Sequence, residues 1–280
     1  MQKIETVTAM REAAAALRAG GRKIALLPTL GALHAGHASL IRLARESGAA
    51  VVVSTFVNPL QFGPSEDLGK YPRTAAADAM LVEKEGVEVL FIPTVEEMFP
   101  KGFSTLVQEE AVSKPLCGVT RPAFFRGTLT CWLKLFSIVQ PDVLVMGEKD
   151  MQMVAVVKKV AADLLLPFTI LTGPVVRDAD GMTTSARNNY LTPSQREEAV
   201  AVVKALRKAK EMVDAGVRST DRWVAEATHI ITAKRRLRVI YISVVDPRTM
   251  EPVREVVPGE CLMAVSYWVD EVRLTDNMPL

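Results

Sequence analysis

Residues 24–37 read IALLPTLGALHAGH, and this stretch decides the fold. Its first four residues form a short apolar run, which is typical of a buried strand. A turn with two glycines and two histidines follows, and residues 39–46 then carry apolar side chains at helical spacing. A strand, a glycine-bearing turn and a helix in this order indicate the start of a βαβ unit.

The same alternation continues along the first two-thirds of the chain. Further strands are predicted at residues 50–57, 87–92, 143–146 and 168–171, and helices at residues 74–85, 127–139 and 151–164. Strands that alternate with helices favour a parallel sheet covered on both faces. We therefore expect a Rossmann-like, doubly wound α/β domain over residues 1–174.

A different pattern follows this domain. Two long helices are predicted at residues 193–214 and 220–233, and strands at residues 238–245 and 261–267. This order indicates a smaller α+β domain over residues 175–280. The loop at residues 176–191 is rich in Asp, Gly, Thr, Ser and Asn, so we expect it to act as a hinge or lid.

Composition excludes several classes of protein. Of 280 residues, 49% are hydrophobic and 24% charged, which is globular composition, and the net charge of +2 offers no field to recruit nucleic acid. Three cysteines without CxxC spacing favour reduced thiols over a disulfide or zinc site. The polar first residues and the lack of a long apolar run predict a cytoplasmic protein with no membrane partner.

Three loops that follow strands carry the residues of most chemical interest. In doubly wound sheets the ligand crevice lies beyond the carboxyl ends of the strands. The loops at residues 28–37, 58–62 and 147–150 all stand at such ends. We expect the functional site to be built from them.

His34 and His37 are two of only three histidines in the chain. A histidine pair can form half of a metal site, but no third ligand at suitable spacing accompanies this one. At a helix N-terminus, backbone N–H groups and imidazole donors suit phosphate, and Gly31 and Gly36 permit close approach. Phosphate recognition is therefore favoured over a purely capping or core role, which remains the alternative.

These motifs resemble, in order, those of the pantothenate synthetase family within the HIGH-motif nucleotidylyltransferase superfamily. Residues 28–37 have the PTxGxLHxGH form typical of that family. Further collinear matches cover essentially the whole chain: residues 56–59, Gln61, Phe62, 66–68, 71–74, Asp78, 125–127, 134–136, 140–142, 147–150, Asp180, Gly181, Ser185, Arg187, Asn188, 244–247, Arg273, Leu274, Asp276 and Asn277. No Walker A or G-x-G-x-x-G pattern competes with them.

The resemblance implies an ATP-dependent ligase that activates an acid as its acyl-adenylate and passes the acyl group to an amine. The acid is pantoate and the amine β-alanine in the family, and a homodimer and Mg²⁺ are implied. His34, His37, Lys149 and Arg187 would be the catalytic residues, with His37 as proton donor. ATP would be bound by Leu30, Gly31, Ala32, Leu33, His34, Ala35, Gly36, His37, Gly147, Glu148, Lys149, Asp150, Val176, Thr184, Ser185, Ala186 and Arg187.

Several of these assignments have a simpler structural alternative. Lys149 in a GEKD turn is a surface charge on composition alone, and only its position and family match favour ATP contact. Asp150 suits a helix cap as well as it suits ATP. Asn58 and Gln61 suit a turn, although the resemblance assigns Gln61 to the acid and amine. Asp78 is a weak candidate ligand for Mg²⁺.

Six residues depart from the family pattern. Leu30 and Leu60 replace methionine or small residues, Phe124 replaces histidine, and Met153 replaces a glutamine that binds pantoate. In the lid, Thr184 and Ala186 replace the methionine and the second serine of the family's MSSR. Each lost polar partner of a hydroxy acid costs about 1–3 kcal/mol. We therefore expect a diverged or redesigned ligase with altered acid specificity; neutral drift or better packing is the alternative.

Two other functions remain open. The superfamily includes nucleotidylyltransferases that transfer AMP to a phosphate-bearing acceptor, and the matches beyond residue 58 make this the second choice. A nucleotide-binding relic without turnover is the third, although the retained His34, His37, Lys149 and Arg187 speak against it.

Overall fold

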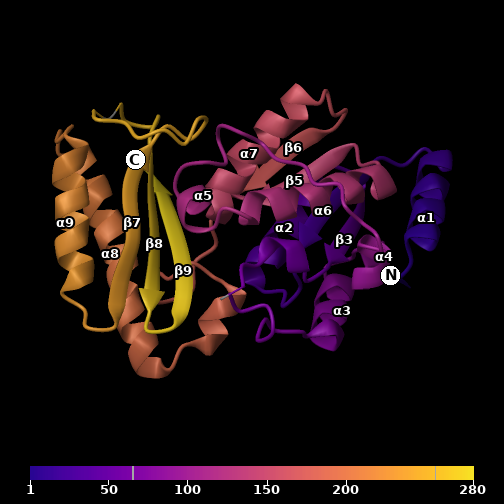
Figure 1. Ribbon diagram of the computed structural model, residues 1–280, viewed down its shortest axis with the longest axis horizontal. Coiled ribbons are helices and arrows are strands. Elements are labelled where there is room, and N and C mark those ends of the chain that lie inside the picture. The colour runs from indigo at the N-terminus through magenta and orange to yellow at the C-terminus, as the bar shows by residue number, and fades with distance from the viewer. Residues whose placement is uncertain (65, 256) are drawn as a thin grey trace. The chain divides into compact units, whose positions relative to one another are not determined.

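The computed structural model describes residues 1–64, 66–255 and 257–280. The chain forms two compact units (Figure 1). The first comprises Met1–Glu148 and Val156–Pro174, and the second comprises Lys149–Ala155 and Val175–Leu280. The short segment that begins at Lys149 thus groups with the C-terminal residues.

The first unit is built on a six-stranded sheet in the order β1-β4-β3-β2-β5-β6. Every strand pair is parallel. Parallel sheets are covered on both faces, so their strands read as apolar runs, as residues 24–27 do. The strands are β1 (Gln2–Ile4), β2 (Ile24–Thr29), β3 (Ala50–Thr55), β4 (Val89–Phe91), β5 (Val143–Gly147) and β6 (Thr169–Gly173).

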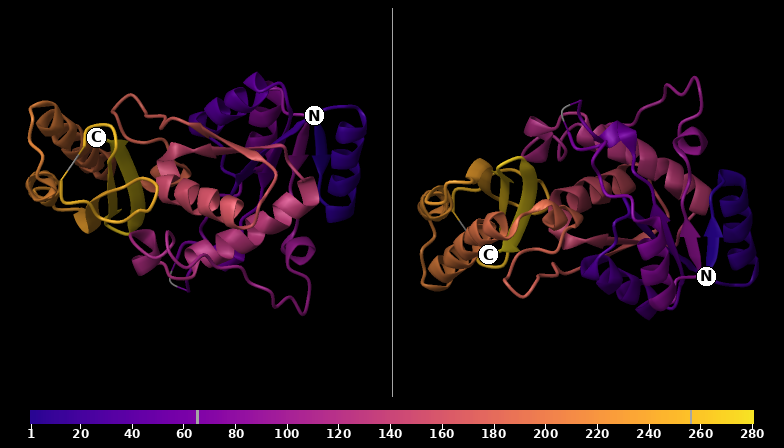
Figure 2. Two further views of the ribbon diagram at one scale, coloured as in Figure 1. Left: turned by 90° about the horizontal axis from the view of Figure 1, so that it is seen from above. Right: turned by 90° about the horizontal axis from the view of Figure 1, so that it is seen from below.

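Helices cover both faces of this sheet (Figure 2). One face packs against α2 and α3. Ile41 of α2 and Val82 of α3 share a buried hydrophobic cluster with Val51 and Val53 of β3. Helices α1 and α6 contact each other and β2 on the other face. The expected doubly wound fold is confirmed. The helices of the first unit are α1 (Val7–Ala19), α2 (Ala35–Glu46), α3 (Ala75–Lys84), α4 (Val95–Met98), α5 (Cys117–Thr120) and α6 (Phe124–Val139), with the short 3₁₀ turn η1 (Pro59–Gln61). Helix α7 (Met151–Asp163) and the 3₁₀ turn η2 (Glu148–Asp150) are divided between the units, and the 3₁₀ turn η3 (Ala186–Tyr190) belongs to the second unit.

The topology has a switch point at β2. This strand pairs with β3 on one side and with β5 on the other. The chain continues from β2 into one half of the sheet and enters the other half at β5, so the loops after these two strands diverge. Ligands of doubly wound sheets bind between such diverging loops. The turn after β2 contains both histidines.

The second unit is a smaller α+β structure, as predicted. Its antiparallel sheet has the order β7-β8-β9, with β7 (Leu237–Val245), β8 (Leu262–Val269) and β9 (Val272–Pro279). Helices α8 (Pro193–Asp214) and α9 (Thr220–Thr232) pack together against this sheet (Figure 1). Trp223 is fully buried in this core, and Thr192 caps α8 with Pro193 at its first position.

Five helices and strands were missed from the sequence: the four-residue helices α4 and α5, and the elements α1, β1 and β9. Helix α1 is rich in alanine and buries only Met10 and Ala14, so few large apolar side chains mark its position, although a Thr6 cap starts it. Strand β1 has only three residues. Strand β9 reads VRLTDNMP, a polar sequence that extends because it pairs with β8 along its whole length.

The predicted starts of two helices were also late. Helix α2 begins at Ala35 rather than at residue 39, and α6 begins at Phe124 rather than at residue 127.

In the part of the chain that the structure describes, no helix combines the length and apolar character needed to cross a membrane.

Candidate active site

The turn after β2 holds His34 and His37 in a reciprocal arrangement. His34 is the N-cap of α2, and its Nδ1 accepts a hydrogen bond from the backbone N–H of Gly36 at 3.2 Å. The backbone N–H of His34 donates to Nδ1 of His37, also at 3.2 Å. The two rings lie with centroids 4.1 Å apart. Both imidazoles therefore satisfy backbone donors at the start of the helix.

This arrangement fixes which ring nitrogen carries the proton. A neutral imidazole has one donor and one acceptor nitrogen, and Nδ1 is the acceptor in both rings. The proton of each neutral ring therefore resides on Nε2. Gly36 makes the close packing possible, because a Cβ on Gly36 would lie 3.0 Å from Cε1 of His34.

Asp78 of α3 supports the loop that precedes the histidines. Its buried carboxylate accepts hydrogen bonds from the N–H groups of Ala32 at 3.0 Å and Leu33 at 2.8 Å, and from the hydroxyl of Thr74 at 3.0 Å. Gly31 and Ala32 both have positive φ, so this carboxylate holds an unusual backbone conformation in place. Its role as a ligand of Mg²⁺ stays a prediction.

Clusters of metal-binding side chains are absent from the described part of the chain. Within residues 1–64, 66–255 and 257–280, no group of three His, Cys, Asp or Glu side chains could hold a metal ion.

The loop after β3 places Asn58 and Gln61 against α6. The Asn58 amide donates to the Oε1 of Gln61 at 3.1 Å and to the carbonyl of Gly127 at 3.0 Å. The hydroxyl of Thr128 donates to the same Oε1 at 3.4 Å. Both amide side chains are buried. The Oδ1 of Asn58 also accepts the N–H of Leu60 at 3.1 Å, so Asn58 both caps the 3₁₀ turn η1 and orients Gln61.

Phe124 and Leu60 flank this cluster, and both are partly buried. The guanidinium of Arg121 stacks on the ring of Phe124, 3.8 Å from its centroid, and Phe125 contacts the ring edge-on at 5.0 Å. Arg121 is itself ion-paired with Glu66. A cation thus covers one face of Phe124.

Gly147 and Glu148 lie at the carboxyl end of β5, on the edge of the sheet where β2 also ends. Gly147 pairs with Gly173 of β6. The hydroxyl of Thr172 donates to the Glu148 carboxylate at 3.0 Å. This bond orients Glu148 toward β6.

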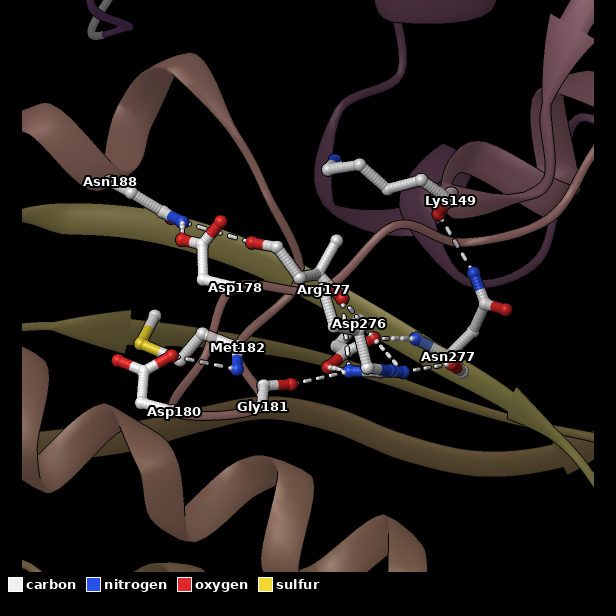
Figure 3. Close-up of polar contacts among 10 residues, drawn as sticks. Lys149, Arg177, Asp178, Asp180, Gly181, Met182, Asn188, Asp276 and Asn277 are labelled. Carbon is white, nitrogen blue, oxygen red and sulfur yellow. Dashed lines mark hydrogen bonds and ion pairs between the residues drawn. The ribbon is translucent and has the colours of Figure 1, made fainter. Parts of the chain in front are cut away.

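The second unit begins with Lys149. Its ammonium is 3.3 Å from the carboxylate of Asp150, which is well exposed, and its backbone carbonyl accepts from the Asn277 amide at 2.7 Å (Figure 3). The Lys149 side chain retains 25% exposure. Met153, one turn into α7, is buried at 6% exposure.

The predicted lid, residues 176–191, is an ordered loop in this unit. The N–H of Thr184 donates to the Val176 carbonyl at 3.0 Å, closing a narrow hairpin. Ser185 then caps the 3₁₀ turn η3, with its hydroxyl accepting from the N–H of Arg187 at 3.3 Å. Ala186 is buried, at 6% exposure. Four of the predicted ATP-binding residues therefore share one short segment, 184–187.

Asp178 holds this hairpin together. Its carboxylate accepts from the Thr184 hydroxyl at 2.7 Å and from Arg196 of α8 at 2.7 Å. Arg196 also pairs with Asp180. Partial burial raises the pKa of Asp178, but the hydrogen bonds from Arg196 and Thr184 outweigh burial and lower this pKa below its usual value.

The structure groups the predicted site residues by unit. The first unit joins the histidine turn to Asp78 and separately joins Asn58 to Gln61. The second contains Lys149, Met153 and the segment 184–187. Sequence reasoning gave no role to Arg177, Asp178 or Arg196; the signal available was the unusual density of polar residues between 177 and 196.

We expect Gly127→Ala to destabilise the protein and displace the Gln61 turn. A Cβ at this position would lie 2.0 Å from the Leu60 carbonyl oxygen, so the backbone must move. Overpacking of this kind costs about 1–3 kcal/mol. Urea unfolding would measure the change against Gly69→Ala, where no atom lies within 4 Å of the added Cβ. Equal stability of the two variants would contradict the close approach.

We expect the contribution of Asp178 to stability to depend on pH. Because its folded-state pKa is lowered, this contribution is present above the unfolded pKa of about 3.9 and is lost as the pH falls through the lower folded pKa. Asp178→Asn should cost about 1 kcal/mol at pH 7, and this difference should shrink in acid. Urea unfolding across this range checks it, with the exposed Asp214→Asn as control; a pH-independent difference would refute the assignment.

Comparison with known proteins covers almost the whole chain. The family model described as pantoate-beta-alanine ligase matches residues 2–279. The chain is 44% identical over 278 residues to the pantothenate synthetase of Heliobacterium modesticaldum, covering 99% of each protein. It is 43% identical over 280 residues to that of Moorella thermoacetica, covering 100% of this chain and 99% of the relative.

Solved structures give the same result. A crystal structure of pantothenate synthetase from Thermus thermophilus superposes with a TM-score of 0.94 at 36% identity, covering 100% of this chain and 99% of that one. The pantoate-beta-alanine ligase of Francisella tularensis, complexed with beta-gamma ATP and beta-alanine, superposes with a TM-score of 0.83 at 28% identity, over 100% and 97%. This chain belongs to the pantoate–β-alanine ligase family.

Proposed function

We propose that this protein forms an amide from pantoate and β-alanine in two steps at the expense of ATP. In the first step the carboxylate of the acid attacks the α-phosphorus of ATP, which releases pyrophosphate and forms an acyl-adenylate. In the second step the amine attacks the acyl carbon, and AMP leaves. Family membership over residues 2–279 supports the ligase activity, and the geometry of the histidine turn supports the phosphate chemistry.

The histidine turn is the single observation that carries the proposal. Because Nδ1 of His34 and of His37 accepts a backbone N–H, each neutral ring can offer Nε2–H to a phosphate oxygen. The N-terminus of α2 adds its dipole to the same position. Donors fixed in advance stabilise charge as it builds on the triphosphate, which is the main requirement of phosphoryl transfer. His37 is assigned the role of proton donor.

Further side chains are proposed to neutralise the remaining phosphate charge. Lys149 and Arg187 supply the cations, and Ser185 supplies a hydroxyl. ATP at physiological pH carries Mg²⁺, which binds mainly through phosphate oxygens and few carboxylates. The lack of a three-ligand cluster among the described residues fits a metal that arrives with its nucleotide. Asp78 already holds the loop backbone at Ala32 and Leu33, so a direct metal bond would compete with those contacts.

Gln61 is proposed to bind the acid and the amine. Its Oε1 accepts from Asn58 and Thr128, so the amide is oriented with Nε2 as the group available to donate to a substrate. A fixed donor of this kind suits a carboxylate or hydroxyl oxygen. Asn58 contributes by orienting Gln61.

The acid specificity is proposed to differ from that of the family pattern. Met153 and Phe124 replace residues that could hydrogen-bond a hydroxy acid, while Leu60 and the buried Ala186 add apolar surface. A site without those donors discriminates less against acids with fewer hydroxyl groups. The proposal includes a diverged or redesigned origin of these departures. The homodimer also stays a prediction.

Removal of either imidazole should abolish most of the activity. We expect His34→Ala and His37→Ala each to lower kcat for pantoate-dependent ATP–pyrophosphate exchange by about 10²–10³-fold, the cost of removing one fixed donor to a developing charge. The matched control is His229→Ala, because this third histidine is exposed on α9. Unchanged exchange in both active-site variants would exclude the proposed role; a dinucleotide product in place of an amide would favour the nucleotidylyltransferase alternative instead.

A change at Met153 tests the acid specificity. Met153→Gln should raise kcat/KM for pantoate by about tenfold relative to an apolar acid of similar size, because the restored amide pairs with a hydroxyl group. AMP release with β-alanine and a panel of acids would measure this ratio. If the unaltered protein already strongly prefers pantoate and the substitution leaves the preference unchanged, the specificity is that of the family.

A further inference from the structure

Two neighbouring residues of β9 contact functionally distinct parts of the second unit (Figure 3). The amide of Asn277 donates to the backbone carbonyl of Lys149 at 2.7 Å. The carboxylate of Asp276 accepts two parallel bonds from Arg177, at 2.7 and 2.9 Å. Asp276 and Asn277 are buried, at 5% and 6% exposure. Polar groups buried in a strand are costly unless they are fully paired, so their contacts are informative.

Asp276 fastens the lid hairpin to β9. Besides the Arg177 fork, it accepts the hydroxyl of Thr183 at 2.6 Å and the N–H of Asn277 at 2.8 Å. Arg177 in turn donates to the carbonyls of Gly181 and Asn277, both at 3.1 Å. Planar pairing of a guanidinium with a carboxylate is the most geometrically restrictive ion pair. The strand and the hairpin that leads to residue 184 are therefore held in one register.

Asn277 extends this rigid network to Lys149. The Asn277 backbone is fixed on one side by β8, through its pairing with Ala264, and on the other by Arg177. Its amide can then hold the peptide group of Lys149 at a defined position. The bond reaches the main chain of Lys149, so it acts on where the side chain starts and not on the ammonium itself.

We propose that Asn277 is a positioning residue for Lys149, and that the Asp276–Arg177–Thr183 network sets Lys149 relative to the lid segment 184–187. This inference rests on the proposed function, in which Lys149 and the lid segment both bind the phosphates of ATP. Two cationic groups can bind one triphosphate together only if their separation suits it. Misplacement of one of these groups by about 1 Å can lower the rate by a factor of roughly 10². The network supplies that fixed separation within the second unit.

A double-mutant cycle between Asn277 and Lys149 tests the proposal. Pantoate-dependent ATP–pyrophosphate exchange is measured for the unaltered protein, Asn277→Ala, Lys149→Ala and the double variant. Asn277→Ala should lower kcat/KM for ATP by about tenfold or more. The Lys149 carbonyl remains in Lys149→Ala, so the hydrogen bond persists there, yet it no longer positions an ammonium. Asn277→Ala should therefore have less than about a twofold further effect in that background.

The outcomes of the cycle separate this inference from the proposed function. If Lys149→Ala alone leaves exchange unchanged, the role proposed for Lys149 fails and the inference fails with it. If Lys149→Ala is impaired but Asn277→Ala causes the same fold loss in both backgrounds, Asn277 is structural only and this inference alone is overturned. Absence of any loss in Asn277→Ala overturns it as well.

Two further variants guard against a trivial loss of folding. Asn277→Asp keeps the side-chain volume but removes the donor toward the Lys149 carbonyl, and it should reproduce the coupling seen with alanine. Thr275→Ala, on the same strand, should leave kcat/KM for ATP unchanged. Coupling that appears with Thr275→Ala as well would mean that β9 acts as a whole, and it would contradict a specific role of Asn277.

Discussion

The reciprocal pairing of two imidazoles with the first backbone N–H groups of α2 is the interaction on which the site depends. Unpaired N–H groups at a helix start require partners, and His34 and His37 provide them through Nδ1. The same bonds leave the proton of each neutral ring on Nε2, the nitrogen proposed to donate to an anion. Capping and phosphate recognition are therefore compatible roles of the same residues, because each uses a different ring nitrogen.

Buried carboxylates support both groups of proposed phosphate-binding residues. In the first unit Asp78 binds the N–H groups of Ala32 and Leu33, which precede the histidines. In the second unit Asp276 binds Arg177 and Thr183, which precede the lid segment. Carboxylates suit this task because each offers several acceptor sites. In each unit a buried carboxylate therefore orders a loop. Such a carboxylate can be useful even where its burial does not increase the stability of the fold.

The apolar substitutions lie in surroundings that tolerate them. Met153 and Ala186 are both buried in the second unit, while Phe124 is stacked by Arg121. Methionine adapts to irregular space, and an aromatic ring gains from a cation on its face. A side chain can pack well and still withdraw a hydrogen bond from a substrate. Good packing and the proposed change in acid specificity are therefore compatible at these residues.

The sequence alone determined the alternation of strands and helices in the first two-thirds of the chain, the parallel character of the first sheet and the position of the histidine turn, because apolar periodicity and glycine placement are local properties. It did not reveal α1 or β9, whose alanine-rich and polar sequences become ordered through packing and through pairing with β8. Nor did it assign roles to Asp276 and Asn277. Their contacts are with residues about 100 and 128 positions away in the chain, at Arg177 and Lys149, and only tertiary structure brings such residues within hydrogen-bonding distance.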